Sequence, residues 1–365
     1  MQYHPENDPQ HIGLKVNEGV SEVPMVNPYM RPKRVRPSFT VDEYVDAILK
    51  GDITMLSRAV TLVESSLPSD QKMAQAVIER CLPHAGKAVR LGITGVPGAG
   101  KSTFIDEIGT LLTKKGKRLA VLAIDPSSER SKGSILGDKT RMERLSIDPK
   151  AFVRPSPSAG SLGGVARKTR ESVILCEAAG FDTIIVETVG VGQSETAVHS
   201  MVDFFLLIQL AGTGDELQGI KRGIMEMADG IAINKCDGNN VEKAKVARNQ
   251  FQNALHLFPP HESGWTPEAV TCSAVEGNGV EDVWNMVERY VEFTKANNYF
   301  DEKRTRQAKY WMFESINEHL RDNFYQNKTI EDLLKHYEQR VLHNEISSFI
   351  AAHELLDTYF KLIKE

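Results

Sequence analysis

A short glycine-rich segment between an apolar stretch and a helical pattern constrains the fold of this chain most. It runs Gly-Val-Pro-Gly-Ala-Gly-Lys-Ser from Gly95 to Ser102, which is the spacing of a phosphate-binding P-loop. We expect a strand over Ala88–Thr94 before it and a helix from Ser102 to about Lys114 after it. Glycines here let backbone N–H groups turn toward a phosphate at the N-terminus of the helix. The segment therefore predicts a strand–loop–helix unit that binds a nucleoside triphosphate.

Apolar segments alternate with helical patterns after this unit, which favours a mostly parallel sheet flanked by helices. These segments are nearly continuous in apolar residues, as expected for strands that are covered on both faces. Further strands are expected at Arg118–Ile124, Thr183–Glu187, Phe204–Leu210, Gly230–Asn234 and Ala269–Cys272. The predicted fold class is α/β, a P-loop NTPase with a helical N-terminal segment and a C-terminal helical arm.

Composition suggests where the parts of the chain begin and end. Residues 1–38 are rich in proline, asparagine and charge, which is typical of a flexible tail. We expect a helical segment over 39–86, the phosphate-binding domain over 87–297 and the helical arm over 298–365. The basic cluster Arg31–Arg36 could be a phosphate-binding arm, but a solvated tail is the preferred interpretation. The arm has apolar faces but no catalytic signature, so from its residues alone it could cap the sheet or form a dimer.

Charge and cysteine content argue against several classes of protein. The formal net charge is −5 and the pI is near 6.1, so the chain has no overall attraction to nucleic acids or anionic membranes. Its four cysteines are far apart and lack the spacing of a zinc site, which favours reduced thiols in the cytosol. The N-terminus does not resemble a secretion signal, and no apolar run would cross a bilayer. We expect a soluble, cytoplasmic protein without nucleic-acid or membrane partners.

The side chains around the P-loop predict a magnesium site. Lys101 can neutralise the β- and γ-phosphate oxygens, and the Ser102 hydroxyl can ligate Mg²⁺. Magnesium also needs carboxylate oxygens or water around it. Asp125 ends the second expected strand, and Glu187 ends the third. The spacing from Glu187 to Gly190 is that of a switch motif whose carboxylate faces the metal and whose glycine N–H faces the γ-phosphate.

A second motif predicts which base is bound. Asn234, Lys235 and Asp237 follow an apolar strand in the pattern Asn-Lys-x-Asp. The Asp237 carboxylate can accept hydrogen bonds from guanine N1–H and its 2-amino group, whereas adenine has an acceptor at N1 and no such amine. Ser273 and Ala274 follow the last expected strand, where a backbone N–H can reach the guanine O6. The ligand is therefore predicted to be GTP or GDP.

With these motifs in this order, the chain resembles the MeaB/ArgK/MMAA family of P-loop GTPases from about residue 40 to the C-terminus. The most specific segments are Asp125–Ser128, Gly133–Met142, Glu187–Glu195 and Gly214–Lys221. The resemblance implies that Asp138 and Arg141 belong to a first switch, with Asp138 near the metal. It implies a second switch that includes Gln193 and Glu195, and a third over Gly212–Lys221 with Gln218, in which Lys221 reaches the nucleotide or an interface.

Motifs and resemblance together define the expected site. The metal ligands are Ser102, Asp125, Asp138 and Glu187, and the catalytic group is Lys101, Asp125, Asp138, Glu187 and Lys221. The nucleotide-binding set is Gly95, Val96, Pro97, Gly98, Ala99, Gly100, Lys101, Ser102, Thr103, Gly190, Asn234, Lys235, Asp237, Ser273 and Ala274.

The resemblance also implies a function. Relatives are chaperone-like GTPases that act on an adenosylcobalamin-dependent acyl-CoA mutase, methylmalonyl-CoA mutase or a similar enzyme. A homodimer that gates cofactor loading and protects the mutase from inactivation is therefore expected. Val191 follows Gly190, so the usual water-orienting glutamine is absent there, and we expect slow hydrolysis that a partner accelerates.

Other functions remain open at this point. A kinase or transport ATPase would share the P-loop, although Asn-Lys-x-Asp argues against ATP. A GTPase that inserts nickel or cobalt would share the architecture, but such proteins commonly carry metal-binding clusters and the histidines here are scattered. A switch protein whose hydrolysis is incidental is the non-enzymatic possibility.

Overall fold

The computed structural model describes residues 39–124, 142–155, 162–188, 194–212 and 222–364. The chain forms two units, Met1–Thr40 and Val41–Glu365, and the elements below belong to the second. No helix within the described ranges combines the length and the apolar character that a membrane crossing requires. The division of the chain at residues 38, 86 and 297 stays a prediction.

The centre of the second unit is a seven-stranded sheet in the order β3-β2-β4-β1-β5-β6-β7. All neighbouring strands run parallel, as in a doubly wound α/β fold. The strands are β1 (Val89–Gly95), β2 (Leu119–Ile124), β3 (Ala151–Pro155), β4 (Thr183–Thr188), β5 (Phe204–Leu210), β6 (Gly230–Asn234) and β7 (Glu268–Thr271). The predicted α/β fold is confirmed, and the six expected strands are all present.

Strand β3 was not expected from the sequence. It is an edge strand that pairs only with β2 in the sheet order, and it carries Arg154 and Pro155. Proline lacks the N–H needed in the middle of a sheet but is tolerated at an edge. A short segment with a charge and a proline has no clear strand pattern, so its place depends on β2.

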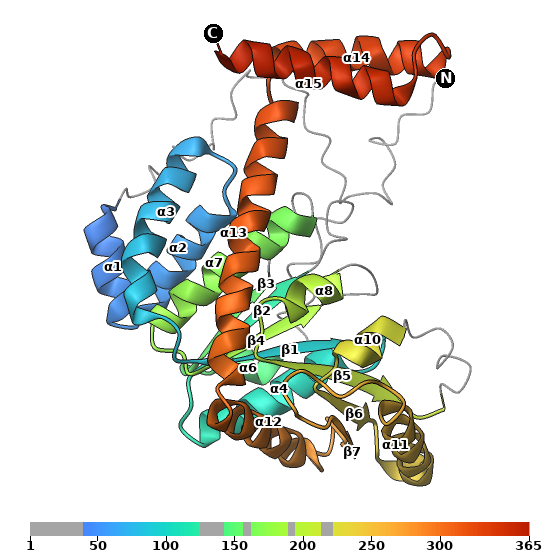
Figure 1. Ribbon diagram of the computed structural model, residues 1–365. Helices are drawn as coiled ribbons and strands as arrows, with labels where there is room; N and C mark the ends of the chain where they lie inside the picture. The colour runs from blue at the N-terminus through green and yellow to red at the C-terminus, as the bar shows by residue number, and fades with distance from the viewer. Residues whose placement is uncertain (1–38, 125–141, 156–161, 189–193, 213–221, 365) are drawn as a thin grey trace, which may run out of the picture. The chain divides into compact units, whose positions relative to one another are not determined.

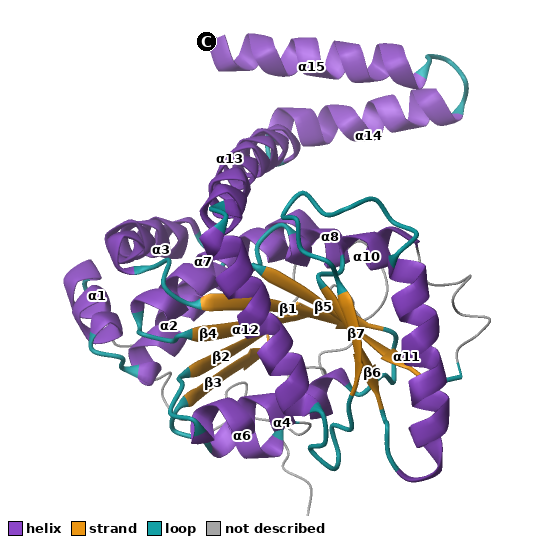
Figure 2. Cartoon of the chain, turned by 60° about the horizontal axis from the view of Figure 1, so that its bottom comes forward, coloured by secondary structure: helices purple, strands orange, loops and turns teal. Residues whose placement is uncertain are grey.

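Helices cover both faces of the sheet (Figure 2). One face packs against α4 (Lys101–Lys114), α6 (Glu143–Ile147) and α12 (Val280–Ala296). The other face lies under α7 (Leu162–Ala178), α8 (Ser194–His199), α10 (Arg222–Met227) and α11 (Val241–Leu255). Short 3-10 turns lie at Leu82–His84 and Gly238–Asn240. Side chains from the sheet and helices form the buried core, which includes Phe104, Trp284 and Phe251.

Three N-terminal helices pack on one another and on α7. They are α1 (Val41–Leu49), α2 (Ile53–Glu64) and α3 (Pro68–Cys81). The N-terminus of α2 is capped by Asp52, whose carboxylate accepts hydrogen bonds from the N–H groups of Thr54 and Met55 at 2.8 and 3.1 Å. The expected helical character of this region is confirmed.

Three helices end the chain. The long helix α13 (Tyr299–Tyr325) starts at α12 and leads to α14 (Lys328–Leu342) and α15 (Ser348–Lys364), which lie side by side (Figure 1). Residues in the first half of α13 are buried against the sheet region, Phe300, Lys303, Gln307 and Trp311 among them. Most of α14 and α15 is exposed, so the arm keeps surface that the rest of the described chain does not cover.

Candidate nucleotide-binding site

The glycine-rich turn lies between β1 and α4, as its spacing predicts. Gly95 ends β1, and a Cβ there would come within 2.2 Å of the Ile208 carbonyl oxygen on the neighbouring strand β5. Gly100 is the N-cap of α4 with φ of 85°, a left-handed conformation that glycine adopts without penalty. Pro97 and Gly98 form the exposed side of the turn, Ala99 is buried beneath it, and Val96 is partly buried against the core.

Lys101 and Ser102 start helix α4 at the carboxyl edge of the sheet. The Lys101 ammonium group donates a hydrogen bond to the Gly95 carbonyl at 2.8 Å, and only 9% of the residue is exposed. Thr103 is exposed on the same turn. A cation at the N-terminus of a helix faces unsatisfied backbone N–H groups, and an anionic ligand would neutralise both. The arrangement suits a phosphate group.

Ser102 contacts the carboxylate predicted to hold magnesium. Its hydroxyl donates a hydrogen bond to Glu187 Oε1 at 3.2 Å. Glu187 lies in β4 opposite Ile93 of β1, and 3% of it is exposed. A hydroxyl and a buried carboxylate side by side form the oxygen donor set that Mg²⁺ prefers. Residues Ser102 and Glu187 therefore fit a magnesium ion next to the P-loop lysine.

Two threonines that the sequence analysis did not single out hold the same strand ends together. Thr188 Oγ1 donates to Thr94 Oγ1 at 3.0 Å. Both threonines are at most 2% exposed. They join the ends of β4 and β1 directly beside Glu187 and Gly95. A hydroxyl residue flanking each motif in otherwise apolar strands is the signal that could have identified them.

Asn234 connects the phosphate loop to the two loops expected around the base. Its Nδ2 donates to the Ala99 carbonyl at 2.8 Å, and its Oδ1 accepts from the N–H of Ala274 at 3.0 Å. The residue ends β6 and is 1% exposed. Both polar ends of the amide are therefore satisfied by backbone. The P-loop, the Asn-Lys-x-Asp loop and the Ser273–Ala274 loop meet at one edge of the sheet.

The rest of the base loop is also held in place. Ser273 Oγ donates to Asp237 Oδ2 at 2.6 Å, which orients the carboxylate predicted to face guanine. Asn240, which the sequence analysis did not single out, donates from Nδ2 to the Lys235 carbonyl at 2.7 Å. Lys235 is exposed with φ of 60°. An asparagine in the turn after the motif was the available signal, but asparagine is common in turns.

Several predicted residues cannot be placed in this arrangement. Asp125, Asp138, Arg141, Gly190, Gln193, Gln218 and Lys221 lie outside the described residues. The remaining predicted switch residue, Glu195, lies in the first turn of α8 and is 2% exposed. Within the described ranges, no group of three or more His, Cys, Asp or Glu side chains could hold a metal ion.

Several known proteins are similar to this chain in sequence, and a solved structure is similar to it in fold. A probable GTPase from Mycobacterium tuberculosis is 48% identical over 87% of this chain and 95% of its own length. The Escherichia coli protein named GTPase ArgK is 44% identical over 83% of this chain and 91% of its own. The mouse methylmalonic aciduria type A homolog, which is mitochondrial, is 42% identical over 87% of this chain and 79% of its own.

The solved structure of a protein called LAO/AO transport system kinase matches with a TM-score of 0.70 at 35% identity, covering 89% of this chain and 99% of that one. Residues 56–329 match the model of the family described as Methylmalonyl Co-A mutase-associated GTPase MeaB. This extent of similarity, together with a parallel sheet that carries the P-loop and the Asn-Lys-x-Asp loop at one edge, shows that the chain belongs to the MeaB family of GTPases.

Proposed function

We propose that this chain binds GTP with Mg²⁺ between the P-loop and the Asn234–Asp237 loop and hydrolyses it. The observation that carries the proposal is the Asn234 amide, which joins the Ala99 carbonyl to the Ala274 N–H. One nucleotide can bridge the phosphate loop and the base loop only if both lie at one edge of the sheet, and this amide keeps them there.

The chemistry at the phosphate end follows from the same residues. Lys101 would neutralise charge that develops on the phosphate oxygens during hydrolysis, and the helix N-terminus would add its partial positive charge. Ser102 and Glu187 would hold Mg²⁺, with Asp125 and Asp138 completing its ligands and Lys221 assisting catalysis. Bound magnesium would supply positive charge that stabilises the negative charge of the phosphate groups.

The chemistry at the base end favours guanine over adenine. The Asp237 carboxylate is oriented by the Ser273 hydroxyl at 2.6 Å and would pair with two N–H groups that adenine does not present. A site built for such pairing rejects a base that leaves the carboxylate unpaired by a factor on the order of 10⁴. The proposal therefore excludes the kinase or transport ATPase that the name of the structural relative suggests.

The partner is proposed to be an acyl-CoA mutase that uses adenosylcobalamin. The family name describes its members as associated with methylmalonyl-CoA mutase. We propose that hydrolysis by this chain gates cofactor loading of such a mutase and protects it from inactivation. Because Val191 replaces the usual water-orienting glutamine, turnover of the chain alone would be slow and the mutase would accelerate it.

The C-terminal arm is proposed to form a homodimer. Apolar side chains on its surface include Phe313, Ile316, Leu320, Phe349 and Phe360, which are between 47% and 86% exposed. They lie on α13 and α15, and exposed apolar side chains gathered on neighbouring helices favour contact with another chain. A second copy of the same arm offers a complementary apolar surface, as in an isologous dimer.

Competition between nucleotides tests the base site. A fluorescent GDP analogue bound to the protein should be displaced by GTP at a concentration at least about 10³-fold below that of ATP. Asp237→Asn should reduce this ratio, and it should favour xanthosine triphosphate, whose carbonyl at C2 can accept a hydrogen bond from the new amide. Equal displacement by ATP and GTP in the unaltered protein would contradict the proposal.

Turnover with and without a mutase tests the partner. Phosphate release from GTP should be slow for the chain alone and should rise at least about tenfold when an adenosylcobalamin-dependent acyl-CoA mutase is added. Lys101→Ala should abolish both rates, whereas Lys115→Ala, at the far end of the same helix, should leave them unchanged. A rate that no mutase changes would leave GTP hydrolysis standing but remove the chaperone role.

A further inference from the structure

A row of side chains on α13 holds the segment that connects α8 to β5. Trp311 Nε1 donates to the Ser200 carbonyl at 3.1 Å, and Gln307 Nε2 donates to the Val202 carbonyl at 2.8 Å. Lys303 Nζ donates to the Asp203 carbonyl at 2.6 Å. Donors four residues apart lie on one face of a helix. This face of α13 therefore fixes the backbone that directly follows α8.

On its other side, α8 packs tightly on the sheet. A Cβ at Gly92 in β1 would come within 2.8 to 2.9 Å of Val198, Val202 and Phe205. The glycine thus allows α8 and its following segment to approach the strand closely. Val198 and Val202 are fully buried. The helix cannot move toward the sheet without a clash, and its end cannot leave without breaking the hydrogen bonds to α13.

Helix α8 also packs on the two strands that lead to the candidate site. Its first turn carries Ser194 and Glu195, both at most 2% exposed. The helix contacts β4, the strand that carries Glu187, and also β1, which ends at the P-loop. A short, buried helix transmits displacement because packed interiors do not deform continuously. Helix α8 thus packs on the strands that carry Glu187 and lead to the P-loop, and the segment after its last residue is bonded to α13.

We propose that α13 positions α8 for GTP hydrolysis and that Trp311 is the positioning residue of this contact. The inference rests on the proposed function, because it assigns to the arm an effect on the same site. Trp311 does not touch the nucleotide. It acts by holding the segment that follows α8, so that a displacement of α13 also displaces the helix that packs on β4 and β1.

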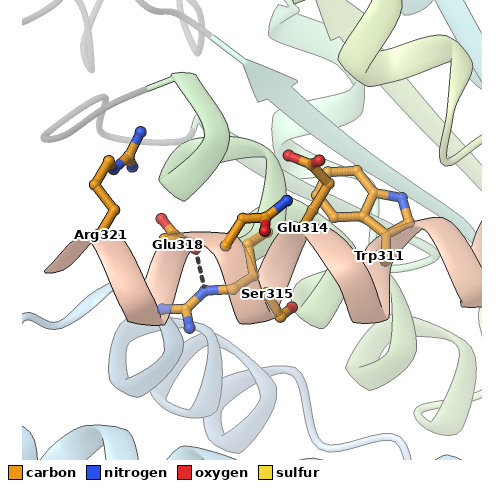
Figure 3. Close-up of a pocket in the computed structure, with 7 residues that line it drawn as sticks. Trp311, Glu314, Ser315, Glu318 and Arg321 are labelled. Carbon is orange, nitrogen blue, oxygen red and sulfur yellow. Dashed lines mark ion pairs between the residues drawn. The ribbon is translucent and has the colours of Figure 1, made fainter. Parts of the chain in front are cut away.

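The surroundings of Trp311 suit such a role. The residue is 8% exposed and lines a cavity of about 130 Å³ together with Arg167, Glu314 and Glu318. Figure 3 shows the indole beside Glu314 on α13, with the ion pair between Arg167 and Glu318 one turn further along. Phenylalanine keeps one six-membered aromatic ring and removes the N–H donor together with the five-membered ring. The contact can therefore be tested without removing a large core side chain.

The chain offers a matched control for this substitution. Trp265 Nε1 donates to the Asp229 carbonyl at 2.9 Å, and its ring packs on Tyr290 and Phe293. Trp265→Phe removes the same kind of hydrogen bond, but one that is donated to the residue before β6 and not to the segment between α8 and β5. Trp311→Phe should lower the single-turnover rate of GTP hydrolysis about fivefold, the factor that corresponds to a hydrogen bond of about 1 kcal/mol. Trp265→Phe should leave the rate within about twofold.

Affinity separates positioning from a merely structural role. The affinity for GDP should change less than about twofold in Trp311→Phe, because the phosphate and base contacts are unaltered. Gln307→Leu removes the neighbouring hydrogen bond and should lower the hydrolysis rate in the same direction. Circular dichroism and the melting temperature show that each variant is folded. If Trp311→Phe is unstable, the hydrolysis rate of Gln307→Leu alone tests the inference.

Tryptophan emission gives an independent measurement. The chain has three tryptophans, and exchange of GDP for a non-hydrolysable GTP analogue should change the emission of the unaltered protein and of Trp265→Phe. The change should be lost in Trp311→Phe. Equal hydrolysis rates and equal emission changes in Trp311→Phe and Trp265→Phe would overturn the inference. The proposed function would still stand if the unaltered chain hydrolyses GTP. No hydrolysis by the unaltered chain, with or without a mutase, would overturn both.

Discussion

His199 ends α8 with an imidazole that is partly buried. Its ring packs edge-on against Phe205 at 5.6 Å between centroids. Burial lowers the pKa of His199 to about 4, and the nearby Lys303 ammonium and His261 lower it as well, against the Asp229 carboxylate that raises it. The imidazole is therefore neutral in the folded protein at neutral pH, and its protonation would place a charge between α8 and the sheet.

We expect the free energy of unfolding to fall as the pH is lowered from about 6.5 to about 4. Within this range the unfolded chain binds a proton at His199, whose ordinary pKa is 6.5, while the folded chain does not. Proton binding to the unfolded state alone costs stability, by up to about 3 kcal/mol at the lower end. Urea unfolding at several pH values should show a weaker pH dependence in His199→Phe than in the unaltered protein.

An exposed histidine provides the control for this experiment. His256→Phe, at the end of α11, should keep the pH dependence of the unaltered chain. A pH dependence in His199→Phe equal to that of the unaltered protein would show that the His199 imidazole does not contribute.

At the scale of elements, helix α4 brings the phosphate loop and the base loop together. Its N-cap Gly100 has a φ of 85°, and a Cβ there would approach Asn234 Nδ2 to 2.7 Å. At the other end of the helix Gly116 has a similar φ of 90°, but a Cβ there would meet nothing within 4 Å. Only the first glycine is required both by the backbone conformation and by a neighbour.

These two glycines allow the conformational cost to be separated from the contact. Gly100→Ala and Gly116→Ala should each lower stability by about 1–2 kcal/mol, because a side chain is strained in the left-handed region. Only Gly100→Ala should also weaken GDP binding, by about tenfold or more, since it displaces the Asn234 amide from Ala99. Titration with a fluorescent nucleotide and thermal unfolding measure both effects. Equal nucleotide affinity in the two variants would contradict this explanation.

At the scale of the whole molecule, charged side chains fasten the arm to the sheet. Arg304 in α13 forms an ion pair with Asp203 at 2.7 Å and also donates to the Ala88 carbonyl at 2.6 Å. Arg90 in β1 and Glu177 in α7 form a second buried pair at 2.9 Å, which joins the sheet to a covering helix and not to the arm. Buried charges of this kind need their partners, because removal of one leaves the other desolvated. The start of α13 is thereby fixed, whereas its outer half presents apolar side chains to solvent.

We expect the unaltered chain to be a dimer in solution and Ile316→Glu to be a monomer. Ile316 is 47% exposed on α13 and lies between Phe313 and Leu320 on the same face. A carboxylate in an apolar interface would lose its hydration without gaining a partner. Light scattering measures the mass. Lys335→Glu, on an exposed side chain of α14, should stay dimeric, and an unaltered mass in Ile316→Glu would exclude this face as the interface.

The sequence alone determined the fold class, six of the strands and the motifs of the candidate site. These features depend on residues that are close to one another in the sequence. A buried parallel strand requires a continuous apolar run, a phosphate turn requires glycines at set positions, and recognition of guanine requires a carboxylate after the strand. Such requirements can be identified without knowledge of the rest of the chain.

Only the tertiary structure decided how distant segments meet. Strand β3 forms because β2 offers an edge, although Arg154 and Pro155 weaken its own pattern. The Asn234 amide joins Ala99 to Ala274, and Trp311 contacts Ser200. These residues are far apart in the sequence, and no local pattern predicts that they meet. Packing brings these residues together after the strands have been ordered, so the contacts between loops, and the link from α13 to α8, become visible only in the folded chain.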